Sequence, residues 1–446
     1  MKLSQVAKIL KAQLTGADGE FQNVSIDSRT LQRGDLFIAL QGPSFDGHDF
    51  VNQAQEKGAC AAIVSNPMDS ALSLILVKDT QKALMDLACY HREQHLIPLV
   101  AITGSCGKTT TRALVASILE QEGLTLSSQG SFNNNIGVPL MLLKLNVQHE
   151  YMVQEIGANH AGEILPLVKI AKPRVAVLTC AAPVHLEGFG DLKGVATAKS
   201  EIFQGLDKDG VAIINADDEF CEFWKKQARA FRVITFGIHK SADVQAKNLQ
   251  SNSDGAFSFR LETSLGAVSV LLKLIGAHNV INALAAASAA VALNISLQKI
   301  KVGLELAEPE KRRLNIKVGF RGAKIIDDSY NANPAAFLAA IHVLKPHQGK
   351  KVLVVGDMGE LGDHAEFYHQ ELGRQAKAFG VDKLYCVGSW SKHCATTFGQ
   401  EGFHFESKHQ LIEALKKKLD AETTVLVKGS FSMGMDEVVK GLVKVA

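Results

Sequence analysis

The chain has 446 residues, of which 46% are hydrophobic and 21% charged, and its 48 basic side chains nearly balance 46 acidic ones. The length predicts about three domains, and the net charge of +2 argues against a protein that wraps nucleic acid or lies on a membrane surface. The seven cysteines are scattered without a Cys-x-x-Cys pair, which disfavours a disulfide framework and a structural zinc site and fits a reducing cytoplasm.

The first part of the chain, residues 1–82, predicts a small mixed α/β domain. Residues 1–15 interrupt their apolar positions with lysines at helical spacing and lack the continuous apolar segment of a signal peptide. Short runs of β-forming residues alternate with turns rich in Gly and Asp, at 36–40, 61–64 and 74–77.

From residue 98 onward, apolar runs and amphipathic stretches alternate, which predicts a parallel sheet flanked by helices. The expected strands are 99–103, 151–156, 174–179 and 211–215, and the expected helices are 109–122, 163–171 and 195–206. Residues 244–275 have a period of two with turn signals, which predicts antiparallel hairpins. The alanine-rich stretch 280–293 is shorter than the ~18 apolar residues of a spanning helix, so we expect a buried helix.

A second α/β unit is expected over residues 311–446. Its strands are predicted at 324–327, 351–355, 383–387 and 424–427, with helical stretches between them. Ligands of open α/β sheets bind at the carboxyl ends of the strands, so we expect both units to carry their sites there.

The strongest motif is the sequence TGSCGKTT at 103–110, which follows an apolar strand and opens a helix. Glycines let backbone N–H groups surround phosphate oxygens, Lys108 supplies a positive charge to the β and γ phosphates, and the Thr109 hydroxyl is placed to ligate Mg²⁺. Ile102 occupies the position of the first glycine in the general motif, so this loop is a variant. We expect the nucleotide to be held by Gly104, Ser105, Cys106, Gly107, Lys108, Thr109 and Thr110.

Three residues near other strand ends are candidates for the same site. Glu155 ends an apolar strand, where it would serve as a metal ligand or as a solvated glutamate, and the loop upstream favours the metal. His185 follows a third strand, and a metal ligand and a hydrogen-bonded surface histidine are equally compatible with that place. Lys199 lies on a helix and, from spacing alone, is an ordinary lysine paired with acidic neighbours.

Several polar segments each leave two interpretations open. The block 327–334, rich in Asp and Asn, suits a helix start or a ligand crevice. Arg312 and Arg313 would offer a cation to a phosphate or would be surface charges. Asn282 would hydrogen-bond the edge of an adenine or cap its helix, and the amide cluster 133–135 would bind a polar substrate or form a turn.

In this order, these segments resemble the Mur ligase family of peptidoglycan precursor synthesis over nearly the whole chain. The segments that look like the UDP-binding domain of its third and fourth ligases are 27–29, 34–40 and 46–48. The segments that are similar to the dipeptide-adding member are 132–139, 155–163, 327–334 and 356–362.

The resemblance implies a UDP-substrate-binding domain at 1–82, an ATP-binding central domain at 83–310 and a Rossmann-like ligand-binding domain at 311–446. It implies a ligase that uses ATP and Mg²⁺ to add D-alanyl-D-alanine to UDP-N-acetylmuramoyl-tripeptide through an acyl phosphate. Such an enzyme is expected to be cytoplasmic and monomeric, with small-molecule substrates, no nucleic-acid partner and no membrane insertion.

The resemblance also implies roles for single residues. It implies that the catalytic residues are Lys108, His185 and Lys199. It also implies that the ligands of Mg²⁺ are Thr109, Glu155, His185 and Lys199, and that Lys199 binds the metal as a carbamate formed with CO₂. Asn282, Arg313 and Asp328 contact the nucleotide. The residues expected to bind substrate are Ser28, Arg29, Asp46, His48, Asn134, Asn135 and Asn331.

The tail of the chain departs from the family pattern. The segment 428–430 matches, but Phe431 stands where arginine is usual and Gly434 where a basic residue is common.

Three rival functions are a Mur ligase that adds a diamino acid, a folylpolyglutamate synthetase, and a nucleotide-dependent switch. The UDP-domain segments disfavour the folate enzyme, the cluster 133–139 disfavours the diamino-acid ligase, and a switch does not need the second α/β unit.

Overall fold

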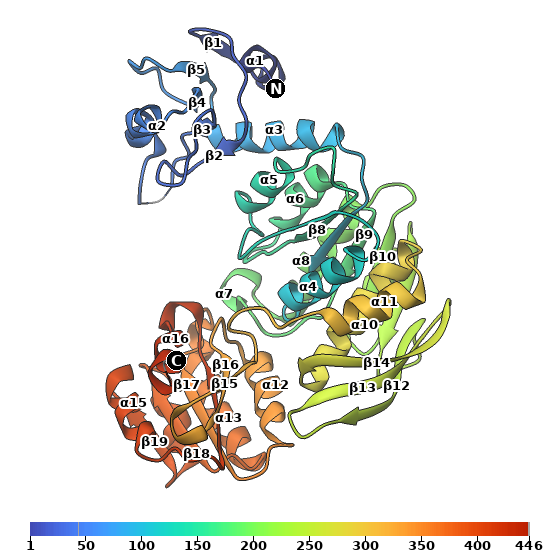
Figure 1. The fold of residues 1–446 in the computed structure, drawn as a ribbon, viewed down its shortest axis with the longest axis vertical. Helices are drawn as coiled ribbons and strands as arrows, with labels where there is room; N and C mark the ends of the chain where they lie inside the picture. Colours follow the sequence, from blue (N-terminus) through green and yellow to red (C-terminus); the bar gives the residue numbers. More distant parts are fainter. Residues whose placement is uncertain (43, 445–446) are drawn as a thin grey trace.

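The computed structural model describes residues 1–42 and 44–444, and within them the strands form three sheets in chain order (Figure 1). The first unit has strands β1 (Gln13–Thr15), β2 (Val24–Ser25), β3 (Leu36–Ile38), β4 (Ala61–Val64) and β5 (Ser73–Leu76), in the order β1-β5-β4-β3-β2. Its helices are α1 (Leu3–Leu10), α2 (Val51–Glu56) and α3 (Thr80–Glu93). The three predicted β runs are confirmed, the last with a shift of one residue.

Helix α3 joins the first unit to the second. The Asp79 side chain accepts a hydrogen bond from Lys82 N at 2.9 Å and starts the helix. The helix crosses the predicted boundary between residues 82 and 83, and it packs on α1 and also on α5 (Gly137–Leu142) and α6 (Ile164–Ala171). One continuous helix therefore connects the first unit to the central unit and packs against both.

The central sheet has the order β14-β13-β12-β11-β10-β9-β6-β8-β7. Its strands are β6 (Leu99–Thr103), β7 (Thr125–Ser127), β8 (Tyr151–Glu155), β9 (Val175–Leu178), β10 (Val211–Asn215), β11 (Arg232–Gly237), β12 (Val244–Ser251), β13 (Ala256–Thr263) and β14 (Gly266–Ile275). The strands from β7 to β12 pair in parallel, and β12, β13 and β14 pair antiparallel, so the change of pattern predicted at residue 244 is confirmed. The inner strand β11 was not predicted.

Helices cover both faces of this sheet, which explains why its parallel strands are continuous apolar runs. One face packs on α4 (Lys108–Leu119), α10 (Ala277–Ala292) and α11 (Leu297–Leu306), and the other packs on α5, α6 and α9 (Cys221–Gln227). The alanine-rich helix is buried as predicted. The single helix predicted at 195–206 is wrong, because α8 (Leu192–Ser200) ends at Ser200 and a 3₁₀ turn follows. Within the described residues, no helix has both the length and the apolar composition to cross a membrane.

The third unit has a sheet of order β15-β16-β20-β17-β18-β19, in which only β15 runs antiparallel to its neighbour within the described residues. Its strands are β15 (Asn315–Val318), β16 (Lys324–Asp328), β17 (Lys350–Gly356), β18 (Lys383–Val387), β19 (Gly402–Phe405) and β20 (Thr423–Lys428). Helices α12 (Pro334–Leu344), α13 (Ala365–Ala378) and α14 (Lys392–Phe398) cover one face, and α15 (Lys408–Lys416) and α16 (Asp436–Leu442) cover the other. The four predicted strands and the α/β class are confirmed.

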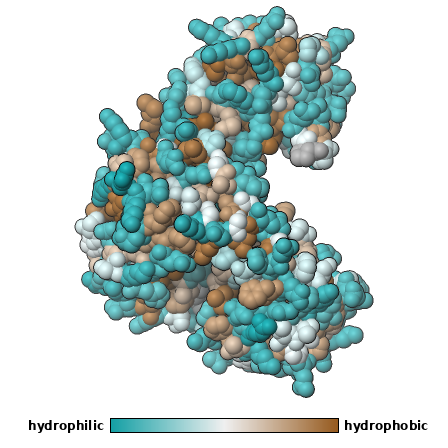
Figure 2. All heavy atoms as spheres, turned by 180° about the vertical axis from the view of Figure 1, so that it is seen from behind, coloured by the Kyte–Doolittle hydropathy of each residue, from teal (hydrophilic) through white to brown (hydrophobic). Residues whose placement is uncertain are grey.

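The three units form an arc. The space-filling view shows a hollow between the first and third units, with the central unit as the back of the arc (Figure 2). The carboxyl ends of the central strands and the third unit come together inside this arc, and a cavity lined by both lies there.

Candidate active site

A cavity of about 710 Å³ separates the central unit from the third unit. Its central wall is formed by the loop after β6, by the ends of β8 and β9, and by the first turns of α10. Its other wall is formed by the segment before β15, by the residues after β16, and by the start of α12. Both α/β units thus present strand ends to one cavity, as the sequence predicts.

The loop between β6 and α4 has the predicted strand–turn–helix context. Gly104 and Gly107 have φ angles of +150° and +80°, which side chains rarely tolerate. A Cβ atom would lie 1.9 Å from Thr179 Oγ1 at Gly104 and 2.2 Å from Asn282 Oδ1 at Gly107. The loop therefore needs both glycines to pass between β9 and α10 with its backbone turned to the cavity.

The residues after the loop form a connected polar group. Lys108 Nζ donates to the carbonyl of Gly104 at 2.8 Å. Thr109 Oγ1 donates to Glu155 Oε2 at 2.8 Å. Arg313 Nη2, from the third unit, donates to Thr109 Oγ1 at 3.0 Å. The phosphate loop, a carboxylate and a guanidinium are thus linked across the two units.

Glu155 is only 4% exposed, so the alternative of a solvated strand-end glutamate is wrong. Its other oxygen accepts a hydrogen bond from Asn133 Nδ2 at 2.8 Å. Asn133 belongs to the predicted amide cluster but was not among the predicted site residues. The place of Asn133 in the amide cluster is its only signal in the sequence, because no local pattern shows that its side chain reaches Glu155 at the end of β8.

Lys199 is 2% exposed, which contradicts the interpretation as an ordinary helical lysine. Its Nζ lies 5.4 Å from the centre of the Phe189 ring. Burial, and then the charge of Lys108, lower the pKa of Lys199 to about 7. A substantial fraction of this amine is therefore neutral near neutral pH.

His185 has a left-handed backbone conformation and precedes the short helix α7 (Leu186–Phe189). Its Nδ1 lies against the carboxylate of Glu360, a residue of the third unit. The interaction with His185 lowers the pKa of Glu360. Glu360 belongs to the stretch 356–362, and no pattern in the sequence pairs it with His185.

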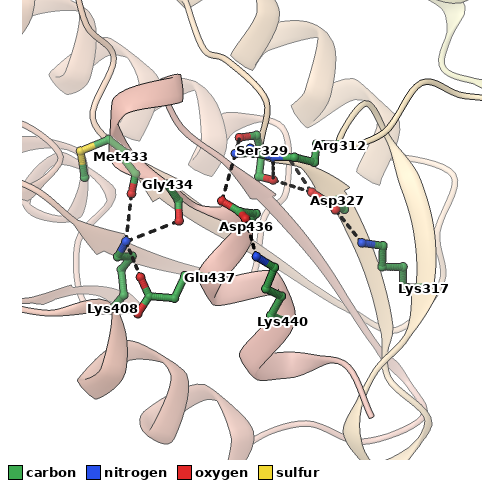
Figure 3. Close-up of polar contacts among 10 residues, drawn as sticks. All are labelled: Arg312, Lys317, Asp327, Ser329, Lys408, Met433, Gly434, Asp436, Glu437 and Lys440. Carbon is green, nitrogen blue, oxygen red and sulfur yellow. Dashed lines mark hydrogen bonds and ion pairs between the residues drawn. The ribbon is translucent and has the colours of Figure 1, made fainter. Parts of the chain in front are cut away.

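Adjacent arginines before β15 take different directions. The Arg313 guanidinium covers the Tyr330 ring at 4.5 Å and reaches Thr109. Arg312 instead turns into the third unit, where it donates to the Ser329 carbonyl at 2.6 Å and pairs with Asp436 at 3.2 Å (Figure 3). Only Arg313 is therefore placed to meet a phosphate.

Asn282 lies in the second turn of α10, so the alternative of a helix cap is wrong. It is buried, it donates to Asn279 Oδ1 at 2.9 Å, and it faces the phosphate loop at Gly107. Across the cavity, Asp328 Oδ2 pairs with Lys428 Nζ at 2.5 Å, and the same amine donates to the Asn331 carbonyl at 2.9 Å.

The block 327–334 serves both purposes that the sequence left open. Asn333 Oδ1 accepts from Ala336 N at 2.8 Å and starts α12. Its Nδ2 lies 3.5 Å from Cys106 Sγ, so the same side chain touches the phosphate loop. Helix capping and cavity lining are thus combined in one residue.

Of the two unusual tail residues, Phe431 lines the cavity. Phe431 is 64% exposed, and its ring is 5.8 Å from that of Tyr330 and 5.8 Å from the Arg312 guanidinium. A lysine of α15, Lys408, reaches the turn at Gly434. Its Nζ donates hydrogen bonds to the carbonyls of Met433 at 3.2 Å and Gly434 at 3.4 Å (Figure 3). The same amine pairs with the carboxylate of Glu437. A basic group therefore lies at this turn although residue 434 is glycine.

The candidate residues of the first unit lie apart from this cavity. Ser28 Oγ donates to Gln53 Oε1 at 2.6 Å, and Arg29 pairs with Asp27 at 2.7 Å. His48 Nδ1 and Asp46 Oδ1 are 2.5 Å apart.

Two amide residues after β7 were predicted to bind substrate, and the structure places one at the cavity and the other outside it. Asn134 lines the cavity, and its Oδ1 accepts from Gly137 N at 2.8 Å, which is the turn interpretation. Asn135 is exposed and lies outside the residues that line the cavity.

The donor atoms of the site fit Mg²⁺. Within residues 1–42 and 44–444, no three His, Cys, Asp or Glu side chains gather as a metal site. The hydroxyl of Thr109 and the carboxylate of Glu155, 2.8 Å apart, are oxygen ligands. Mg²⁺ is usually held by one or two carboxylates and completes its shell with phosphate oxygens and water, so a sparse oxygen site is the expected form.

Three family models match consecutive parts of the chain. The Mur ligase family, catalytic domain, matches residues 20–91, the Mur ligase middle domain matches 102–290, and the Mur ligase, glutamate ligase domain, matches 312–431.

Similar proteins extend over almost the full length. The chain is 44% identical to the UDP-N-acetylmuramoyl-tripeptide–D-alanyl-D-alanine ligase of Escherichia coli (strain K12), over 99% of this chain and 98% of that protein. The structure of MurF from Acinetobacter baumannii is similar with a TM-score of 0.93 and 36% identity, over 98% of this chain and 97% of the other. That of a MurF ligase from Thermotoga maritima in complex with ADP has a TM-score of 0.83 and 26% identity, over 94% and 96%.

Proposed function

The chain belongs to the Mur ligase family, and we propose that it joins D-alanyl-D-alanine to UDP-N-acetylmuramoyl-tripeptide in an ATP-dependent reaction of peptidoglycan precursor synthesis. The observation that carries this proposal is the link from Arg313 to Thr109, which brings the third unit onto the phosphate loop. A nucleotide switch needs no such second unit. The near full-length identity to ligases that add D-alanyl-D-alanine favours this substrate over a diamino acid or folate.

A carboxylate is a poor electrophile, so the reaction first transfers the γ-phosphoryl group of ATP to the terminal carboxylate of the tripeptide. The free amine of D-alanyl-D-alanine then attacks the acyl carbon, and the tetrahedral intermediate expels phosphate. This chemistry needs little covalent help from side chains, so positioning and charge neutralisation carry most of it.

Lys108 is the side chain best placed to reduce the repulsion between carboxylate and triphosphate. Its ammonium group donates a hydrogen bond to the carbonyl of Gly104 in the same loop. From this position the side chain can turn toward the β and γ phosphates of ATP. Arg313 adds a second cation near Thr109. Asn282 and Asp328 line the same cavity and are the proposed contacts of the nucleoside.

Thr109, Glu155, His185 and Lys199 are the proposed holders of Mg²⁺, which when bound neutralises phosphate charge. The buried Lys199 amine, with its pKa of about 7, suits reaction with CO₂. In that reaction nitrogen bonds to carbon and loses a proton, and the resulting carbamate is an anionic oxygen ligand. Without CO₂, Lys199 would place a cation beside Lys108.

The first unit is proposed to bind the UDP part of the substrate through Ser28, Arg29, Asp46 and His48. It stands at the far end of the arc from the third unit, so a long substrate can extend from it to the phosphate loop (Figure 1). Asn134, Asn135 and Asn331 are the proposed contacts of the peptide. We propose a cytoplasmic monomer.

Phosphate release tests the proposal. A ligase releases phosphate from ATP only when UDP-N-acetylmuramoyl-tripeptide and D-alanyl-D-alanine are both present, whereas a switch depends on neither. Running the assay with tripeptides that end in lysine and in diaminopimelate identifies the acceptor. Phosphate release that is the same without D-alanyl-D-alanine would contradict the proposal.

A further inference from the structure

Two cysteines meet at the phosphate loop. Cys106 lies within the loop and Cys180 follows β9, and the two thiols are close enough for each to shift the pKa of the other. Cys180 Sγ also lies 3.7 Å from the Cys106 carbonyl oxygen. Both residues are half-buried and line the cavity, so a small solute in the cavity can reach them.

The backbone holds these two thiols together. Ser105 N donates to the Cys180 carbonyl at 2.9 Å, and Thr179 Oγ1 donates to the Cys106 carbonyl at 2.6 Å. The residues next to each cysteine are thus joined to the opposite segment. A disulfide needs its sulfurs about 2.05 Å apart, and these backbone bonds keep the two side chains on adjacent segments from which rotation can bring the sulfurs together.

The two thiols differ in character. The interaction with Cys180, then contact with Asn333 and the charge of Lys108, lower the pKa of Cys106 to about 6 against the effect of burial. The same pairing and burial raise the pKa of Cys180. Cys106 is therefore the more readily ionised thiol of the two and Cys180 the less readily ionised one, which is the combination of an attacking and a resolving cysteine.

A second contact pair in the same chain provides a contrast. Cys386 and Cys394 are also neighbours, but both are completely buried in the core of the third unit. Cys60 and Cys89 are half-buried, and burial raises the pKa of each. Among the described cysteines, proximity to a second thiol and access from a cavity coincide at Cys106 and Cys180.

We propose that Cys106 and Cys180 are a peroxide-reactive pair whose disulfide closes the phosphate loop to nucleotide. The Cys106 thiolate attacks a peroxide oxygen, the O–O bond breaks, and the leaving hydroxide takes a proton, which gives a sulfenic acid and water. Cys180 then loses its proton and attacks the Cys106 sulfur, so that the S–S bond forms, the S–O bond breaks and a second water leaves. Two electrons pass from the thiols to the peroxide.

The disulfide would change the loop in two ways. It ties the loop covalently to the segment after β9, so the backbone cannot adjust to phosphate oxygens. It also removes the Cys106 sulfur from Asn333, now 3.5 Å away, and so weakens a contact between the loop and the third unit. We expect ADP affinity to fall by at least about tenfold, a change of ~1.4 kcal/mol in binding free energy.

The test uses the full chain, reduced and then treated with hydrogen peroxide. Peptide mass spectrometry should find a Cys106–Cys180 cross-link, and calorimetry should find weaker ADP binding that a dithiol reductant restores. Cys180→Ser should instead accumulate a sulfenic acid at Cys106 that dimedone traps. Cys394→Ser and Cys89→Ser should respond to peroxide as the unaltered chain does, each variant being compared with its own reduced form.

Absence of the cross-link, or a cross-linked chain with undiminished ADP affinity, would overturn the inference. Prior binding of ADP should slow cross-linking several-fold, and an unchanged rate would equally count against it. The loss of ligation on oxidation rests on the proposed function, but the cross-link and ADP binding do not. If the reduced chain binds ADP and fails to ligate, only the proposed function fails.

Discussion

The ends of the central strands and the first unit handle charged groups in opposite ways. Glu155 and Lys199 are almost completely buried at the central site. Asp27 and Arg29, in the first unit, form an exposed pair whose side chains are 34% and 82% accessible. Burying a charged group costs free energy unless a partner or ligand compensates it, whereas an exposed pair is nearly neutral for stability. The difference indicates that the central site is built to receive ions that complete it.

The largest effect is expected for Lys108→Ala. The variant should lose at least about 10³-fold in kcat, because no other cation lies within the loop itself to offset charge in the transferred phosphoryl group. Steady-state phosphate release with both substrates measures it. Lys193→Ala, an exposed lysine of α8, is the control and should keep full activity. Activity of Lys108→Ala within a few-fold of the unaltered chain would remove Lys108 from the mechanism.

Lys199→Ala should be the next most damaging change. If the buried amine carries a carbamate, short carboxylic acids should restore part of the lost activity by supplying the missing oxygen ligand. An amine with a pKa of about 7 is protonated below that pH and reactive above it, so carbamate seen by ¹³C NMR at fixed CO₂ pressure should increase as pH rises through about 7.

Two results would contradict this role of Lys199. One is a failure of every acid to rescue the variant. The other is a carbamate signal that does not depend on residue 199. Lys193→Ala again serves as the control, because it lies on the same helix with its side chain in solvent.

Glu155→Ala should raise the Mg²⁺ concentration needed for half-maximal activity by roughly tenfold or more, since the carboxylate is an expected ligand. Asn133→Ala removes only the amide that orients this carboxylate and should cause a smaller shift in the same direction. Titration of activity with Mg²⁺ at saturating ATP gives both values. Superimposable titrations for Glu155→Ala and the unaltered chain would exclude Glu155 from the metal site.

The adjacent arginines give a closer test. Arg313→Ala removes a hydrogen bond to Thr109 and a cation at the cavity, so kcat/KM for ATP should fall about tenfold, as expected for a bond with a charged donor. Arg312→Ala breaks contacts with Ser329 and Asp436 inside the third unit and should lower thermal stability more than ATP use. Equal kinetic losses in both variants would mean that general positive charge matters and the contact does not.

What the sequence predicted well is local. The loop 103–110 and strands such as β6, β10 and β18 follow from short apolar runs and the residues next to them, which determine buried parallel strands and the turns between them. The strands that were missed are mostly short and lie at sheet edges. β7, β15 and β19 are edge strands with half-exposed or exposed residues, so they carry no apolar pattern.

The contacts that complete the site could not be predicted because they join segments far apart in the chain. Glu360 meets His185, and Arg313 rather than Arg312 meets Thr109, only because the third unit has one orientation against the central sheet. Burial of Lys199 also depends on residues outside its own helix, such as Phe189 of α7, whose ring lies 5.4 Å from Lys199 Nζ. The resemblance to a family supplied roles for these residues that no local pattern contains.

The smallest effect is expected in the first unit, at the exposed pair of Asp27 and Arg29. Arg29→Ala should leave the unfolding midpoint unchanged, because the pair with Asp27 is in solvent. If Arg29 binds the UDP substrate, KM for that substrate should rise roughly two- to fivefold at constant kcat, the range that exposed ion pairs contribute. Arg33→Ala, another exposed arginine of the first unit, should leave KM unchanged. Equal shifts in both variants would indicate long-range attraction of an anionic substrate, whereas a shift confined to Arg29 would identify a direct contact.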